Sequence, residues 1–110
     1  MFTNKTAIWK SKTTQQLAVA LTAIDKQQTM KDFLRDVMTE KEIAEISARL
    51  EAAKILQAGS KYTDIVAKTK LSSRTVARIS DWLKNGCNGY QAALKVVNAH
   101  HSHTPPVRAV

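Results

Sequence analysis

The side chains best suited to binding a ligand gather in one basic run of the sequence, between Lys61 and Leu83. Their ammonium, guanidinium and hydroxyl groups donate hydrogen bonds, which suits them to nucleic-acid phosphates and to the edges of bases. Asp64 and Asp81 lack a histidine or serine in a triad-like context, and no glycine-rich phosphate loop is present, so we expect no enzyme active site. The candidate DNA-binding residues are Lys61, Lys68, Lys70, Ser72, Ser73, Arg74, Thr75 and Arg78.

Two short helices joined by a tight turn are needed to position these side chains. Residues 62–69 are long enough for about two helical turns, and Ile65 and Val66 supply an inward face at helical spacing. Ser72 is placed to cap the next helix, because its hydroxyl can accept a hydrogen bond from a backbone N–H two or three residues later. Lys70 occupies the turn, where a positive φ would strain a lysine.

The second helix presents a short, polar and mostly cationic outer face. Val76, Ile79 and Leu83 recur at i, i+3 and i+7 and face the core, which leaves Arg74 and Arg78 outside. This pattern, over about residues 62–83, is typical of a helix-turn-helix, whose second helix enters the major groove of DNA. The alternative is an ordinary helical hairpin with a solvated basic face.

The charge of the chain favours a polyanionic partner. The formal net charge is +8 for 110 residues. Residues 59–110 carry eight basic and two acidic side chains, against nine and seven in residues 1–58, so the excess lies in the half with the helix-turn-helix. We expect double-stranded DNA as the partner, although basic surfaces also bind membranes and acidic proteins.

The composition is that of one all-α domain. Ala, Leu, Ile and Val predominate over aromatic residues, and strand signals are absent. Cys87 is the sole cysteine and offers no disulfide within the chain, which indicates a reducing compartment. No apolar run is long enough for a signal sequence or a membrane span, so we expect a cytoplasmic protein without a membrane partner.

Further amphipathic stretches predict the remaining helices. We expect helices over about residues 13–24, 29–38 and 90–98, and a long helix that starts at a Thr39–Glu42 capping box and ends near Gly59. The first two carry apolar stripes that one short chain cannot cover. These stripes are formed by Leu17, Leu21 and Ile24 and by Phe33, Leu34 and Val37. The predicted divisions are a flexible arm at 1–12, a helical domain at 13–98 and a disordered tail at 99–110.

One cluster of potential metal ligands, His100, His101 and His103, falls in the predicted tail. It has no carboxylate and no supporting scaffold nearby, both of which a metal site in a protein normally has. We therefore expect no metal site.

Three sequence segments together resemble the Trp repressor superfamily, and most closely its YerC/YecD-type branch. The segments are FLRDVMTEKEIAEISARLEAAKIL from Phe33, TDIVAKTKLSSRTVARIS from Thr63 and WLKNGCNGYQAAL from Trp82, and the resemblance covers residues 14–95. It implies about six helices, with the N-terminal helices of two chains interlocked into a homodimer. It also implies two recognition helices about one DNA turn apart.

The same resemblance places Arg49 and Arg78 where Trp repressor binds its amino-acid corepressor. A guanidinium pairs with a carboxylate and stacks on an indole, so the chemistry would suit tryptophan. The residue after the second arginine is a glycine in Trp repressor, where it leaves room for the ligand ring, but here it is Ile79. We therefore expect no cofactor, with L-tryptophan or another small effector disfavoured by Ile79. The expected alternative is that Arg49 pairs with Glu45 and that Arg78 contacts phosphate.

These observations predict a sequence-specific double-stranded DNA-binding transcriptional regulator, specifically a repressor, acting as a homodimer through its helix-turn-helix. Two other functions stay open: an RNA-binding module, and a helical protein-interaction module without operator recognition. The RNA-binding module would use the same basic charge without a palindromic site, whereas the interaction module would dock a partner through its interlocked helices and use the basic face only for solubility.

Overall fold

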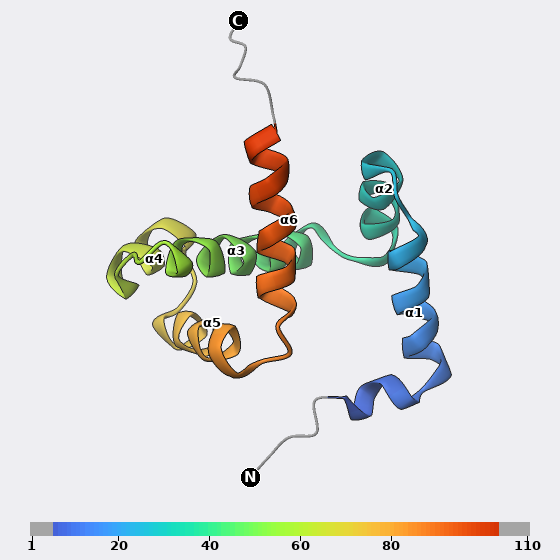
Figure 1. Cartoon of the computed structure of the whole chain (residues 1–110), viewed down its shortest axis with the longest axis horizontal. Helices are drawn as coiled ribbons and strands as arrows, with labels where there is room; N and C mark the ends of the chain where they lie inside the picture. Colours follow the sequence, from blue (N-terminus) through green and yellow to red (C-terminus); the bar gives the residue numbers. More distant parts are fainter. Residues whose placement is uncertain (1–5, 104–110) are drawn as a thin grey trace, which may run out of the picture. The chain divides into compact units, whose positions relative to one another are not determined.

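A computed structural model describes the backbone of residues 6–103 and the side chains of residues 6–99. Every regular element within that range is a helix, as the all-α prediction required (Figure 1). Two compact units, residues 1–44 and 45–110, meet within one helix and are described separately below. The elements are a 3-10 helix η1 (Ala7–Lys10), α1 (Lys12–Ala23), α2 (Gln27–Val37), α3 (Glu40–Gln57), α4 (Tyr62–Thr69), α5 (Ser73–Asn85) and α6 (Gly89–His103).

The two ends of the chain differ from prediction. The expected loose arm contains η1, which is held to α1 by hydrogen bonds from the Thr14 hydroxyl to the Ile8 carbonyl (2.6 Å) and from the Gln15 amide to the Trp9 carbonyl (2.7 Å). At the other end, α6 continues to His103, past the predicted helix end near Asn98 and into the predicted tail. No glycine or proline interrupts α6 before Pro105, which disfavours helical geometry at the residue before it. Residues 1–5 and 104–110 of the predicted arm and tail lie outside the described residues.

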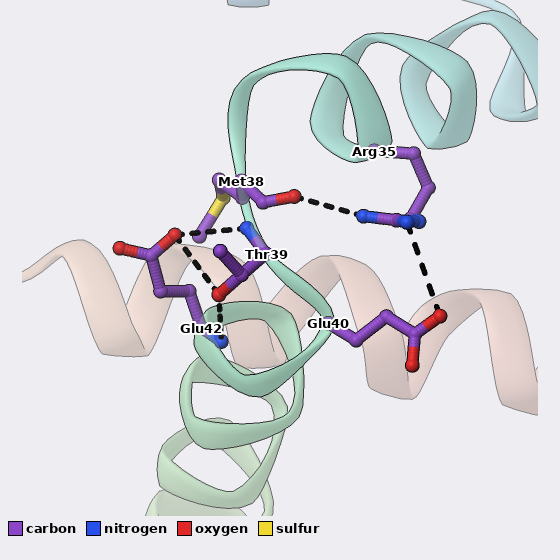
Figure 2. Close-up of polar contacts among 5 residues, drawn as sticks. All are labelled: Arg35, Met38, Thr39, Glu40 and Glu42. Atoms are coloured by element: carbon purple, nitrogen blue, oxygen red, sulfur yellow. Dashed lines mark hydrogen bonds and ion pairs between the residues drawn. The ribbon is translucent and has the colours of Figure 1, made fainter.

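The start of α3 is fixed by a reciprocal pair of hydrogen bonds, as its sequence predicted (Figure 2). The Thr39 backbone N–H donates to the Glu42 carboxylate at 2.9 Å, and the Glu42 N–H donates to the Thr39 hydroxyl at 3.1 Å. Just before this box, the Arg35 guanidinium donates to the Met38 carbonyl at 2.9 Å, at the C-terminus of α2. Both exposed helix ends therefore have partners for backbone groups that the helices themselves leave unpaired.

The core of residues 45–110 is small and is shared by α3, α4, α5 and α6. Two alanines of α3 have no exposed surface, so the helices that pack on them can approach closely. Gly59, with φ +91°, ends α3 in a Schellman motif, because the Ser60 N–H donates to the Ile55 carbonyl and the Gly59 N–H to the Leu56 carbonyl. The fully buried residues are Ala52, Ala53, Ile65, Val76, Ile79 and Leu94.

Helices α1 and α2 contribute no buried residue. Their apolar side chains include Leu17, Val19 and Val37, which are 46%, 67% and 56% exposed. A shallow apolar hollow on α1 is lined by Ala18, Val19, Thr22 and Ala23. These side chains are therefore available for contact with a partner. None of the described helices is both long and apolar enough to cross a membrane.

The capping box gives a testable statement about stability. Glu42→Ala removes the carboxylate that accepts from the Thr39 N–H, and we expect a loss of about 1 kcal/mol in the free energy of unfolding. Urea denaturation measures the loss as a lower midpoint. Glu42→Gln is the matched control, since glutamine can also accept this bond; an equal loss in both variants would show that the box does not contribute.

Candidate nucleic-acid interface

The turn between α4 and α5 is built around a lysine in the left-handed conformation. Lys70 ends α4 with φ 66° and ψ 10°, and its N–H donates to the Val66 carbonyl at 2.9 Å. The Thr69 hydroxyl supports the turn, because it donates to the Ile65 carbonyl (2.7 Å) and accepts from the Leu71 N–H (3.3 Å). The sequence leaves the sign of φ at Lys70 open; the structure gives it a positive φ, so Lys70 is strained relative to glycine.

The first turn of α5 is capped by a serine, as predicted. The Ser72 hydroxyl accepts from the Thr75 N–H at 3.1 Å and donates to the Thr75 hydroxyl at 3.0 Å. Thr75 is half-buried and committed to this cap, whereas Ser73 and Arg74 beside it are exposed. The N-terminal turn of α5 thus presents the long donor side chain of Arg74, which has no partner among the described residues.

The exposed cations of α4, α5 and the turn between them differ in whether they form an ion pair with a carboxylate. The Lys68 ammonium lies 3.7 Å from the Glu51 carboxylate of α3, an exposed pair of the kind that contributes little to stability. The other predicted cations have no ion pair within the described part of the chain and are exposed. These unpaired residues are Lys61, Lys70, Arg74 and Arg78.

The structure joins most of the predicted residues in one connected segment. Lys70, Ser72, Ser73 and Arg74 follow one another from the turn into α5, and Arg78 lies one helical turn further on the exposed side. Sequence reasoning missed the supporting Thr69, although a threonine hydroxyl two residues before a backbone N–H at a helix end is a recognisable turn signal.

Arg49 lies in a half-buried polar environment on α3. Its guanidinium donates to the Glu45 carboxylate at 2.9 Å, which is the pairing that the sequence offered as an alternative to ligand binding. Its Nε is buried and finds no acceptor among the described residues. Burial raises the pKa of the Tyr90 phenol, and the positive charge of Arg49 opposes that shift, so the phenol is neutral at physiological pH.

The residues present do not fit a tryptophan corepressor. Ile79 stands at the position where the indole ring of tryptophan would need space. Its side chain has no exposed surface and belongs to the core cluster. Arg49 already has a carboxylate partner. No group of three His, Cys, Asp or Glu side chains within the described range could hold a metal ion, and the side chains of His100, His101 and His103 lie outside that range.

Comparisons with known proteins agree with the all-helical fold described above. The protein YerC of Bacillus subtilis (strain 168), itself uncharacterized, is 29% identical over 85 residues, which are 77% of this chain and 82% of YerC. The crystal structure of a TrpR-like protein from Eubacterium eligens ATCC 27750 is 31% identical, covers 87% of this chain and 96% of its own, and superposes with a TM-score of 0.76.

A second crystal structure, of a candidate Trp repressor from Staphylococcus aureus, superposes with a TM-score of 0.78 over 87% of this chain and 96% of its own. At 24% identity it supports the fold alone. The family model described as Trp repressor protein matches residues 12–98. The chain therefore belongs to the Trp repressor protein family, a family of DNA-binding regulators and not of enzymes.

Proposed function

We propose that this protein is a sequence-specific, double-stranded DNA-binding transcriptional repressor that acts in the cytoplasm as a homodimer through α4 and α5. The observation that carries the proposal is the run of exposed cations Lys70, Arg74 and Arg78 from the turn into the capped helix α5, none of which has an ion pair among the described residues; Lys61, at the start of α4, is a further exposed cation. Such cations neutralise phosphates, and the first turn of a recognition helix is the part that reaches base edges. Membership of a family of DNA-binding regulators supports the same reading.

Within this surface, some side chains would contact base edges and others would contact phosphates. Arg74 is exposed at the first turn of α5 and is long enough to pair bidentately with a guanine edge, so it reads sequence, with Ser73 beside it. Thr75 contributes less to base reading than Arg74, because its short side chain is half-buried and its hydroxyl accepts a hydrogen bond from Ser72. The cations outside that turn, Lys61, Lys70 and Arg78, hold phosphates. Lys68 contributes less, because DNA must compete with Glu51 for its ammonium group.

The homodimer is proposed from the exposed apolar side chains of α1 and α2. Neither helix buries a residue in one chain, and a short chain of this size buries a modest fraction of its surface alone. A symmetric partner would cover these faces and would present a second copy of α5 to an adjacent turn of the major groove.

Selection of bound sites from random duplex DNA is the experiment that tests the function. A two-fold symmetric dimer selects an inverted repeat with half-sites about one DNA turn apart. Preference for single-stranded RNA over duplex DNA in competition would indicate the RNA-binding alternative. Absence of binding to any nucleic acid would leave the protein-interaction alternative.

Arg74 should carry sequence discrimination. Arg74→Ala is expected to cost about 1 to 3 kcal/mol of binding free energy on the selected site and much less on random duplex, because a lost base contact affects only the correct base. Fluorescence anisotropy on both duplexes measures this difference. Lys70→Ala serves as the comparison and should weaken both duplexes alike; equal losses on both for Arg74→Ala would contradict the assignment.

We expect Lys70 to lower the free energy of unfolding and to raise the affinity for DNA. Lys70→Gly relieves the positive φ and is expected to raise the free energy of unfolding by about 1 kcal/mol. The same change removes a phosphate contact, so DNA affinity falls and the slope of log K against log salt becomes shallower by about 1.

Lys68→Gly is the matched control for Lys70→Gly, two residues earlier and inside α4. Glycine there should lower the free energy of unfolding by about 1 kcal/mol, because no strain is relieved. It should also reduce DNA affinity less, since Lys68 is paired. A stabilised Lys70→Gly protein with unchanged DNA affinity would exclude Lys70 from the interface.

Dimerisation should be coupled to folding of α1. We expect the Tm to rise with protein concentration, and Leu21→Asp to leave a largely unfolded monomer, because it places an unpaired charge in the proposed interface. Gln16→Asp, at an exposed polar position of the same helix, should change little. Light scattering and thermal denaturation measure both effects; a stable monomer of the unmodified protein at micromolar concentration would contradict the dimer.

A further inference from the structure

We propose that Ile79 takes the place of a corepressor in this protein: the chain binds no tryptophan, and its recognition helix α5 needs no ligand to hold it in position. The part of this inference that concerns DNA rests on the proposed function, whereas the part that concerns tryptophan does not. Two independent features of the structure carry it.

The first feature is the burial of Ile79. Its side chain is 0% exposed and packs in the cluster that contains Ala52 and Ala53 of α3, Ile65 of α4 and Leu94 of α6. Protein cores are packed at crystal-like density, so an indole ring could enter here only if this cluster were rearranged. Rearranging a packed core to admit extra atoms typically lowers affinity by roughly tenfold to a hundredfold.

The second feature is the ion pair of Arg49. Its guanidinium is engaged with Glu45 at 2.9 Å, on the preceding turn of the same helix. Glu45 is exposed, so an amino-acid carboxylate would have to compete with it for the Arg49 guanidinium. Arg78, by contrast, is exposed and unpaired within the described residues, which leaves it available for phosphate. Arg49 therefore pairs with Glu45 while Arg78 is available for phosphate, and the two arginines do not bind one ligand together.

The same packing explains why α5 needs no effector. Val76 and Ile79 lie on one face of α5 and are both fully buried, and Ser72 caps its start. The turn before it is fixed by the hydrogen bond from Lys70 to Val66 and by those of Thr69. Core contacts within the chain thus hold the helix that a bound ligand would otherwise have to position.

Calorimetric titration of the full-length protein with L-tryptophan tests the inference directly. We expect no saturable heat, and no rise in Tm when tryptophan is added to a thermal denaturation. Saturable binding at micromolar affinity would overturn the inference, because it would show that the arginine pair outweighs the filled core.

Variants of Ile79 test whether this side chain is what excludes the ligand. Ile79→Gly opens the largest space and should acquire a Tm rise with L-tryptophan or with indole; Ile79→Ala is the second variant, since the glycine is more harmful to a helix. Val76→Ala is the matched control, a cavity in the same helix and core that should acquire no such response. If neither Ile79 variant shows a larger rise in Tm with L-tryptophan or indole than Val76→Ala does, the proposed role of Ile79 is wrong.

DNA binding supplies a separate measurement. The Kd for the selected duplex should be the same with and without L-tryptophan, and a complex that forms only with tryptophan would overturn the inference. If no duplex binds under either condition, the proposed function fails, while the calorimetry still decides whether tryptophan is bound.

Discussion

The burial of Val76 and Ile79 in the core cluster that they share with the α3 alanines is the interaction on which the exposed basic surface depends. Ala52 and Ala53 have no exposed surface, and their small side chains let neighbouring helices approach closely. Because Val76 and Ile79 lie one helical turn apart, burying both fixes the rotation of α5 about its axis. That rotation places Arg74 and Arg78 toward solvent. A hydrophobic contact thereby decides which charges are presented to a polyanion.

Burial is unevenly distributed along the chain, and this has consequences for function. Helices α3 to α6 share a small core, whereas α1 and α2 have no buried residue. The order of each N-terminal helix therefore rests on local hydrogen bonds, such as the Ser11 cap of α1, more than on apolar burial within the chain. Local bonds of this kind contribute on the order of 1 kcal/mol each, which is little for helices of this length. In the proposed homodimer, the apolar faces of α1 and α2 would supply the burial that these helices lack within one chain.

Features determined by near neighbours in the sequence were predictable. The Ser72 cap, the Thr39–Glu42 box and the Gly59 Schellman motif each join residues at most five apart, and each is present. The bounds of α4 also match the prediction, because its apolar spacing and flanking turn are local signals. The true end of α6 was missed, since a polar, histidine-rich sequence was interpreted as disordered although no helix breaker precedes Pro105.

The availability of each charge was not predictable, because it depends on which carboxylates the fold brings near. In the sequence, Lys68 and Lys70 are equivalent cations two residues apart. The fold places Glu51 of α3 beside Lys68, whereas Lys70 has no acidic partner among the described residues. The same contrast separates Arg49, paired within its own helix, from Arg78, which has no ion pair in the described part of the chain. Net charge therefore predicts that a polyanion is attracted, whereas tertiary structure selects which cations can meet it. Lys70 shows the same selection in its backbone, because its positive φ costs stability that glycine would avoid. In exchange, the lysine places at the turn an ammonium group that has no ion pair among the described residues.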